Sequence, residues 1–254
     1  MSIKLIVTDL DGTLLKTDKT ISDYTKSILK RCKAAGIKIA YATGRGGSAE
    51  RVAPSEFFDG KIIINGAVAK IGDEIVYSRL IPCHIARPIL TACDAQGIKI
   101  TSEAGGMHYS NFPVSDFWEH FTNFEIVDFS QHAQDAEKIY SPAPSPQEKA
   151  FADQLLPDSL YSVMTYDITG MMLNIMHKEA TKSKATAELA RLWNIAPEEI
   201  IAFGDELNDI DLLTFAGIGV AVGNALDEAK SIANQVCDTN ENDGIAKWLE
   251  ENIL

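Results

Sequence analysis

Short apolar runs alternate with amphipathic segments at both ends of the chain. A continuous apolar run predicts a buried strand, and apolar residues three and four positions apart predict a helix. The order of these segments is typical of a parallel α/β sheet up to residue 66, and the pattern returns after residue 180. We expect strands at 5–7, 37–42, 61–64, 200–203 and 219–222, a hairpin of 68–71 with 75–77, and helices at 22–35, in the polar stretch after Arg45, at 183–193 and at 246–252.

The middle of the chain, residues 82–179, follows a different pattern. Helices expected there are mixed with short strand-like runs, which is typical of an α+β unit of about a hundred residues. The expected helices are 84–96 and 147–155, and the strand-like runs are 98–101, 107–110, 137–141, 162–166 and 171–177. The fold class that we expect is therefore α/β. A doubly wound, mostly parallel, Rossmann-like sheet is formed by residues 1–81 and 180–254, and an α+β domain at 82–179 is inserted into it.

Composition narrows the choice of partners. The chain has 254 residues, of which 46% are hydrophobic, and its 36 acidic against 23 basic residues give a formal net charge of −13. We therefore expect repulsion from nucleic acids and from anionic membranes. The apolar runs are too short to span a bilayer, the start does not resemble a signal peptide, and the four cysteines form no C-x-x-C pair. These features predict a cytoplasmic protein, and we expect a monomer or weak homodimer.

Polar side chains stand at the ends of three of the predicted strands. They are Asp9 and Asp11, then Thr43, and then Asp205, Asn208 and Asp209. In open parallel sheets, ligands bind beyond the carboxyl ends of the strands. If these strands are neighbours, four carboxylates meet at one edge and repel one another. A hard divalent cation resolves the repulsion, so we expect Mg²⁺, which also supplies the positive charge that an acidic protein needs to hold an anion.

The remaining residues fit a phosphate site. Thr43 offers a hydroxyl, Gly44 a backbone N–H near the start of a helix, Lys182 a mobile ammonium and Asn208 an amide donor. Asp9 could attack phosphorus as a nucleophile, and Asp11, on the same side of the strand, could carry the proton. Each residue alone is commonest in a turn, a helix cap or a solvated face. Their order, each at a strand or helix end, is what indicates a site.

These motifs resemble those of the haloacid dehalogenase-like phosphatases, in particular the Cof-type branch with a large α+β cap. Asp9-Leu10-Asp11-Gly12-Thr13 matches the first motif, Thr43 the second and Gly204 to Asp209 the fourth. The resemblance implies Asp9 as nucleophile and Asp11 as general acid and base. It also implies that Asp205 ligates Mg²⁺ together with the Asp9 carboxylate and the Asp11 backbone carbonyl, that Asp209 supports this metal shell, and that Thr43 and Asn208 face the phosphate.

The third motif departs from the family pattern. Members usually have Lys-Gly at the start of this helix, whereas the chain has Lys182-Ser183-Lys184. Lys182 lies at the usual distance before Trp193, which favours it as the phosphate-contacting lysine. Lys184 remains the alternative. The segments Asn65-Gly66-Ala67 and Val220 to Ala225 also resemble the family.

The activity that we expect is Mg²⁺-dependent hydrolysis of small phosphorylated metabolites, such as sugar phosphates, through an aspartyl-phosphate. A sugar phosphomutase on the same core is an alternative, because it too forms an aspartyl-phosphate. A non-catalytic, phospho-accepting regulatory domain is another, since it also uses an aspartate, a threonine and a lysine, although it needs neither Asp11 nor the insert. The inserted residues would select the substrate, which the sequence does not identify.

Overall fold

The computed structural model describes residues 3–119, 122–167 and 170–254. The chain divides into two compact units. The core unit consists of Met1–Ser78 together with Thr181–Leu254, and the inserted unit is Arg79–Ala180. The inserted unit thus interrupts the core unit in the sequence, and each unit has its own hydrophobic core.

The core unit is built on an eight-stranded sheet. Its strands are β1 (Leu5–Thr8), β2 (Lys38–Ala42), β3 (Gly60–Ile63), β4 (Val68–Ile71), β5 (Glu74–Ser78), β12 (Ile200–Gly204), β13 (Ile218–Ala221) and β14 (Gln235–Val236). They are arranged in the order β14-β13-β12-β1-β2-β3-β4-β5. All pairs from β14 to β3 are parallel, and β4 and β5 are antiparallel. The apolar runs that predicted strands are buried because helices cover both faces of this sheet.

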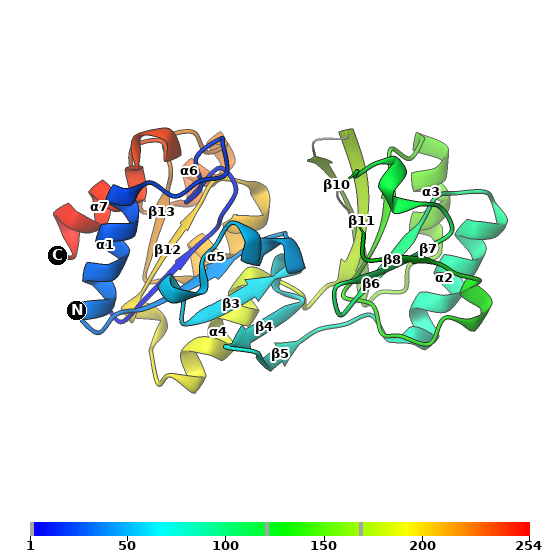
Figure 1. Ribbon diagram of the computed structural model, residues 1–254, viewed down its shortest axis with the longest axis horizontal. Coiled ribbons are helices and arrows are strands. Elements are labelled where there is room, and N and C mark those ends of the chain that lie inside the picture. The colour runs from blue at the N-terminus through cyan, green and yellow to red at the C-terminus, as the bar shows by residue number, and fades with distance from the viewer. Residues whose placement is uncertain (1–2, 120–121, 168–169) are drawn as a thin grey trace. The chain divides into compact units, whose positions relative to one another are not determined.

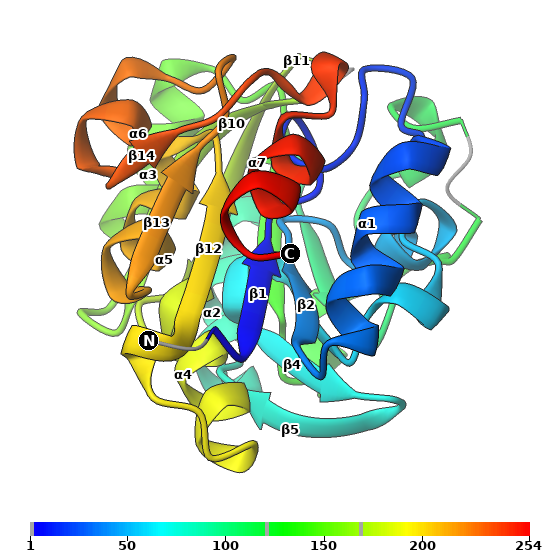
Figure 2. The same ribbon diagram turned by 90° about the vertical axis from the view of Figure 1, so that its left-hand side faces the viewer.

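These helices form two groups. They are α1 (Asp23–Ala34), α4 (Lys182–Leu192), α5 (Ile210–Phe215), α6 (Asp227–Ile232) and α7 (Gly244–Asn252). Helix α1 packs against α7, and α5 packs against both α4 and α6. Figure 1 and Figure 2 show α1 and α7 on one face of the sheet and α4 and α5 on the other, which confirms the doubly wound fold class.

The inserted unit is an α+β layer structure. Its elements are α2 (Cys83–Ala95), β6 (Thr101–Ala104), β7 (Met107–Ser110), β8 (Phe124–Ile126), β9 (Lys138–Pro142), α3 (Pro146–Gln154), β10 (Leu160–Asp167) and β11 (Gly170–His177). The strands form one sheet in the order β10-β11-β9-β6-β7-β8, antiparallel except for the β7–β8 pair. Apolar side chains of α2 and of β9 and β11 share one core. The α+β character that we expected of this unit is confirmed.

Several expected elements differ from the structure. The polar stretch after Arg45 forms no α-helix, only two short 3-10 turns at Gly47–Arg51 and Ser55–Phe57. Gly46 and Gly47 at its start and Pro54 in its middle disfavour a continuous helix. The strand expected at 98–101 begins only at Thr101. The sequence pattern also missed α5, α6, β8 and β14, each of which is too short to show a periodicity.

Candidate active site

The carboxyl ends of three adjacent strands bring the predicted residues together. Strand β1 lies between β2 and β12, and Thr8 at its end is in register with Tyr41 on one side and Phe203 on the other. Asp9 follows Thr8 directly, and Asp205 comes two residues after Phe203. The sheet therefore places these two carboxylates at one edge, as expected of an open parallel sheet.

Lys182 is held between two of the carboxylates. Its ammonium nitrogen lies 2.7 Å from Oδ1 of Asp9 and 2.6 Å from Oδ1 of Asp209, and its side chain has no exposed surface. Thr181 caps α4, so Lys182 stands in the first turn of that helix, where its side chain can reach the sheet edge. Burial alone would lower the pKa of Lys182, but the charges of Asp209 and Asp9 raise it, so the ammonium stays protonated. The mobile ammonium that we expected is therefore a fixed one, and Lys184 is exposed on α4.

Asp205 is fixed by the turn that follows β1. The hydroxyl of Thr13 donates a hydrogen bond to Oδ1 of Asp205. Gly12 has φ +80°, and a Cβ atom at this position would lie 2.4 Å from Oδ2 of Asp205. Only glycine adopts this backbone readily and leaves that carboxylate in place. Asp209 holds the backbone of Asp205, because Oδ2 of Asp209 accepts hydrogen bonds from the backbone N–H groups of Asp205 and Glu206, each at 3.1 Å.

The three buried carboxylates are arranged as a metal site would need them. One oxygen of each of Asp9, Asp205 and Asp209 lies within 4.8 Å of the others. Burial raises the pKa of Asp9 well above its ordinary value; Lys182 lowers it, and Asp209 and Asp205 raise it further. Burial raises the pKa of Asp205 to about 7, although the Thr13 hydrogen bond opposes this. With all three carboxyls ionised, three negative charges would face one ammonium, and a divalent cation would balance the remaining two.

Asp11 lies in a different environment. Its carboxylate accepts hydrogen bonds from Nε and Nη2 of Arg45, the latter at 2.6 Å, and lies 2.8 Å from the ammonium of Lys19. Burial would raise the pKa of Asp11, but the hydrogen bonds from Arg45 and Lys19 lower it below its ordinary value. The side chain is therefore ionised at neutral pH. This is the form that can accept a proton from water, and it would have to take up a proton before donating one.

The predicted phosphate-binding residues lie at the same edge of the sheet as these aspartates. Thr43 is buried at the end of β2, and its hydroxyl accepts the N–H of Arg45 at 3.2 Å. The α-helix expected after Gly44 does not form, so the prediction that a helix dipole acts at the N–H of Gly44 was wrong. The amide of Asn208 donates to Oδ1 of Asn65 at 2.9 Å, and this same oxygen lies 3.1 Å from where a Cβ of Gly44 would be.

Sequence reasoning gave no role to several residues that hold the site. Arg45 and Lys19 contact Asp11, and Thr13 contacts Asp205. Asn224, in a segment that resembled the family, donates to the carbonyl of Gly12 at 2.7 Å. Arg45 could have been noticed as a cation that directly follows the Thr-Gly pair, whereas no signal marked Lys19, which reaches Asp11 from a loop.

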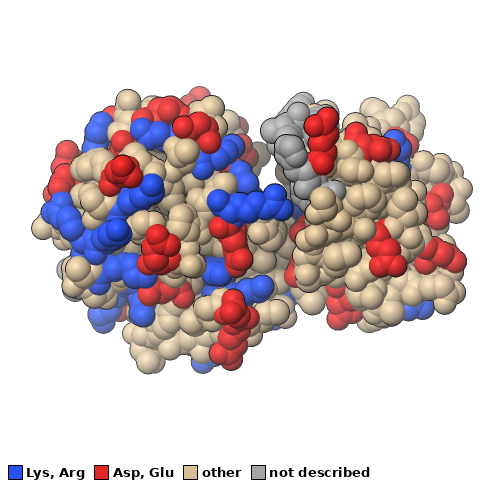
Figure 3. All heavy atoms as spheres, in the orientation of Figure 1, with Lys and Arg blue, Asp and Glu red and all other residues tan. Residues whose placement is uncertain are grey.

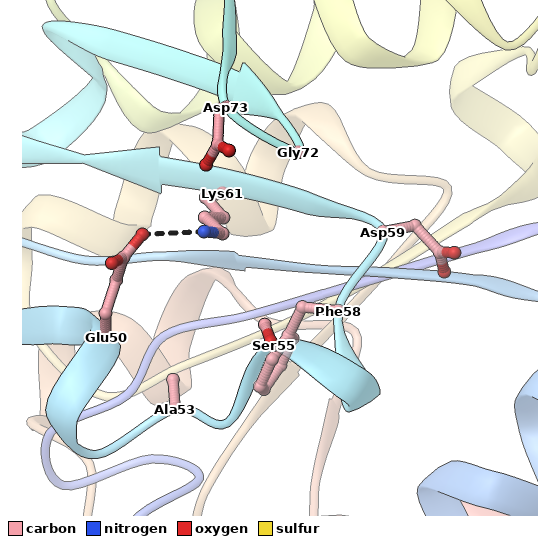
Figure 4. A pocket seen from close by; sticks show the side chains of 8 residues that line it. All are labelled: Glu50, Ala53, Ser55, Phe58, Asp59, Lys61, Gly72 and Asp73. Carbon is pink, nitrogen blue, oxygen red and sulfur yellow. Dashed lines mark hydrogen bonds and ion pairs between the residues drawn. The ribbon is translucent and has the colours of Figure 1, made fainter.

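A separate hollow lies beside β3 (Figure 4). This cavity of about 470 Å³ is lined by Glu50, Ala53, Ser55, Phe58, Asp59, Lys61, Gly72 and Asp73. The ion pair between Glu50 and Lys61, 2.6 Å long, is one of its walls. It contains none of the predicted site residues. Over the core unit, basic side chains are interspersed with acidic ones on the face that Figure 3 shows.

Comparison with known proteins identifies the family. The model of the haloacid dehalogenase-like hydrolases matches residues 6–249. The chain belongs to this family. A 5-amino-6-(5-phospho-D-ribitylamino)uracil phosphatase of Bacillus subtilis is 27% identical over 97% of this chain and 96% of that protein. The motif resemblance to the haloacid dehalogenase-like phosphatases is thereby confirmed.

Solved structures of the family share the whole fold. A phosphatase of the superfamily from Bacteroides thetaiotaomicron has a TM-score of 0.83 and 26% identity, and the match covers 98% of this chain and 95% of that one. A subclass IIB sugar phosphatase has the same score and identity, with 99% and 100% covered. In this chain, none of the helices among the described residues is long and apolar enough to cross a membrane.

Proposed function

We propose that this chain is a Mg²⁺-dependent phosphatase that hydrolyses small phosphorylated metabolites through an aspartyl-phosphate. The observation that carries the proposal is the buried cluster of Asp9, Asp205 and Asp209 around Lys182 at the carboxyl edge of the sheet. Membership in the family supports the enzyme class, because the similar proteins and structures described above are phosphatases.

The metal would be held by Asp9 and Asp205, with the backbone carbonyl of Asp11 as a third ligand. Asp209 would support it through its contacts with Lys182 and with the backbone of Asp205. Oxygen donors and an excess of negative charge fit a hard cation such as Mg²⁺. When bound, this cation would offset charge on the transferring phosphoryl group and lower the repulsion between that group and Asp9.

In the first half of the reaction, a carboxylate oxygen of Asp9 attacks phosphorus. The bond between phosphorus and the leaving-group oxygen breaks, and Asp11, which must have taken up a proton beforehand, gives that proton to the leaving-group oxygen. In the second half, a water molecule attacks the aspartyl-phosphate and gives its proton to the Asp11 carboxylate. The products are the dephosphorylated alcohol and inorganic phosphate, and both Asp9 and the protonated form of Asp11 are restored. Thr43, Asn208 and the N–H of Gly44 would bind the phosphoryl oxygens.

The test is a phosphatase screen of the full chain across sugar phosphates, nucleotides and cofactor phosphates, with and without Mg²⁺. We expect phosphate release from at least one class, dependence on the cation, and loss of activity in Asp9→Asn. If no substrate releases phosphate, or if Asp9→Asn keeps full activity, the proposal is wrong. Free phosphate that accumulates without a bisphosphate activator separates a hydrolase from a phosphomutase.

A further inference from the structure

Asp11, the proposed proton carrier, forms a two-point ion pair with the guanidinium of Arg45. Two donors of Arg45, Nε and Nη2, meet the two oxygens of the Asp11 carboxylate. Such a fork fixes the orientation of a carboxylate as well as its place, which a single ammonium does not. Lys19 contacts one of the same oxygens but is half exposed, so it restrains the carboxylate less.

The backbone that carries Arg45 is itself tied down. Its N–H donates to the hydroxyl of Thr43 at 3.2 Å, and its carbonyl accepts the N–H of Ile64 at 2.9 Å. These bonds join the turn after β2 to the end of β3. The backbone at Arg45 is therefore held in place, so its guanidinium reaches Asp11 from a fixed position. A residue that positions another side chain needs such a fixed backbone.

Two roles are open to a cation at this point. It could bind the substrate phosphate directly, or it could act through Asp11. The two donors that make its fork are both used on Asp11 in this structure, and the pair is only partly exposed, at 25% for the Arg45 side chain and 34% for that of Asp11. These contacts favour the second role.

We propose that Arg45 is a positioning residue, which holds the Asp11 carboxylate where it exchanges protons with the leaving group and with water. The inference rests on the proposed phosphatase function, in which Asp11 carries the proton. A misplacement of about 1 Å can cost roughly a hundredfold in rate, and general acid–base catalysis contributes about 10²–10⁴-fold. We therefore expect the loss of Arg45 to act on kcat, and only through Asp11.

The experiment is a double-mutant cycle with p-nitrophenyl phosphate and Mg²⁺, using wild type, Arg45→Met, Asp11→Asn and the double variant. Arg45→Met should lower kcat roughly 10–100-fold with KM within about threefold. In the Asp11→Asn background, the same change should alter kcat less than about threefold. Arg45→Lys should recover part of the rate, because it restores the charge without the fork. Arg51→Met, an exposed arginine in the same connection, is the matched control.

An equal loss from Arg45→Met in both backgrounds would overturn the inference, as would an effect on KM alone, because the guanidinium would then act on the substrate itself. Thermal melting of each variant separates these results from unfolding. If wild type releases no phosphate, it is the proposed function that fails. Crystal structures of Arg45→Met then still decide the matter, since an Asp11 carboxylate that stays in place without Arg45 contradicts positioning.

Discussion

Lys182 gives the sharpest test of the site, because its removal leaves two buried carboxylates without their shared cation. The side chain is fully buried, and both Asp9 and Asp209 are nearly so. Removing one partner of a buried ion pair costs about 3–5 kcal/mol. In domains of 150–250 residues each kcal/mol lowers Tm by about 2–4 °C, so Lys182→Met should lower the melting temperature of the core unit by roughly 6–20 °C.

The matched control is Lys184→Met on the same helix. Lys184 is exposed, and substitutions at exposed positions usually change the free energy of unfolding by less than about 0.5 kcal/mol. Both variants lose one positive charge, so a difference between them reports the buried position and not the net charge. Phosphatase activity should be lost in Lys182→Met and kept in Lys184→Met.

The pH dependence of the Lys182→Met defect has a definite sign. Without the ammonium, the pKa of Asp9, which burial already raises, rises further. The folded variant then binds more protons than its unfolded chain, and its stability falls as pH rises. Differential scanning calorimetry should therefore show a larger gap to wild type at pH 8 than at pH 5. Equal melting of the two lysine variants at pH 8, or a gap that widens on acidification, would refute the proposed role of Lys182.

Other features of the two units give further predictions. Burial raises the pKa of Asp205 to about 7, so the free energy of unfolding without metal should fall as pH rises from about 4 to above 7. Mg²⁺ should therefore raise Tm more at pH 8 than at pH 5, and an equal rise in Tm at the two pH values contradicts this. Gly12→Ala should abolish that Mg²⁺ effect, whereas Gly36→Ala, at φ +84° with no atom within 4 Å, should only cost about 1 kcal/mol by denaturant unfolding. Burial raises the pKa of Cys32 and Cys93 to about 11, so iodoacetamide at pH 8 should label both far more slowly in the native than in the unfolded protein by mass spectrometry.

The sequence predicted the sheet and the strand-end carboxylates well because both follow from short-range rules. An apolar run such as Leu5 to Val7 has few alternatives to a buried strand, and parallel strands bring their ends to one edge. The helix expected after Arg45 failed because polar residues alone do not set a periodicity, and Gly46, Gly47 and Pro54 interrupt it. The resemblance to the family predicted Lys182 as the lysine of the site. Its burial depends on how α4 packs against the rest of the core unit, and no local sequence pattern predicts that packing.

The two aspartates of the first motif differ because of side chains that lie far away in the sequence. Asp9 is paired with Lys182, 173 residues on, and is surrounded by carboxylates, whereas Asp11 is paired with Arg45, 34 residues on, and with Lys19. Alternation along a strand predicts only that the two point to one side. The environments push their pKa values in opposite directions, upward for Asp9 and downward for Asp11. These directions oppose the proposed roles, because a nucleophile must be ionised and a general acid protonated. A divalent cation beside Asp9 would lower the pKa of its carboxyl, and Asp11 has to take up a proton before it can donate one, so the two roles depend on the loaded site and not on the motif alone.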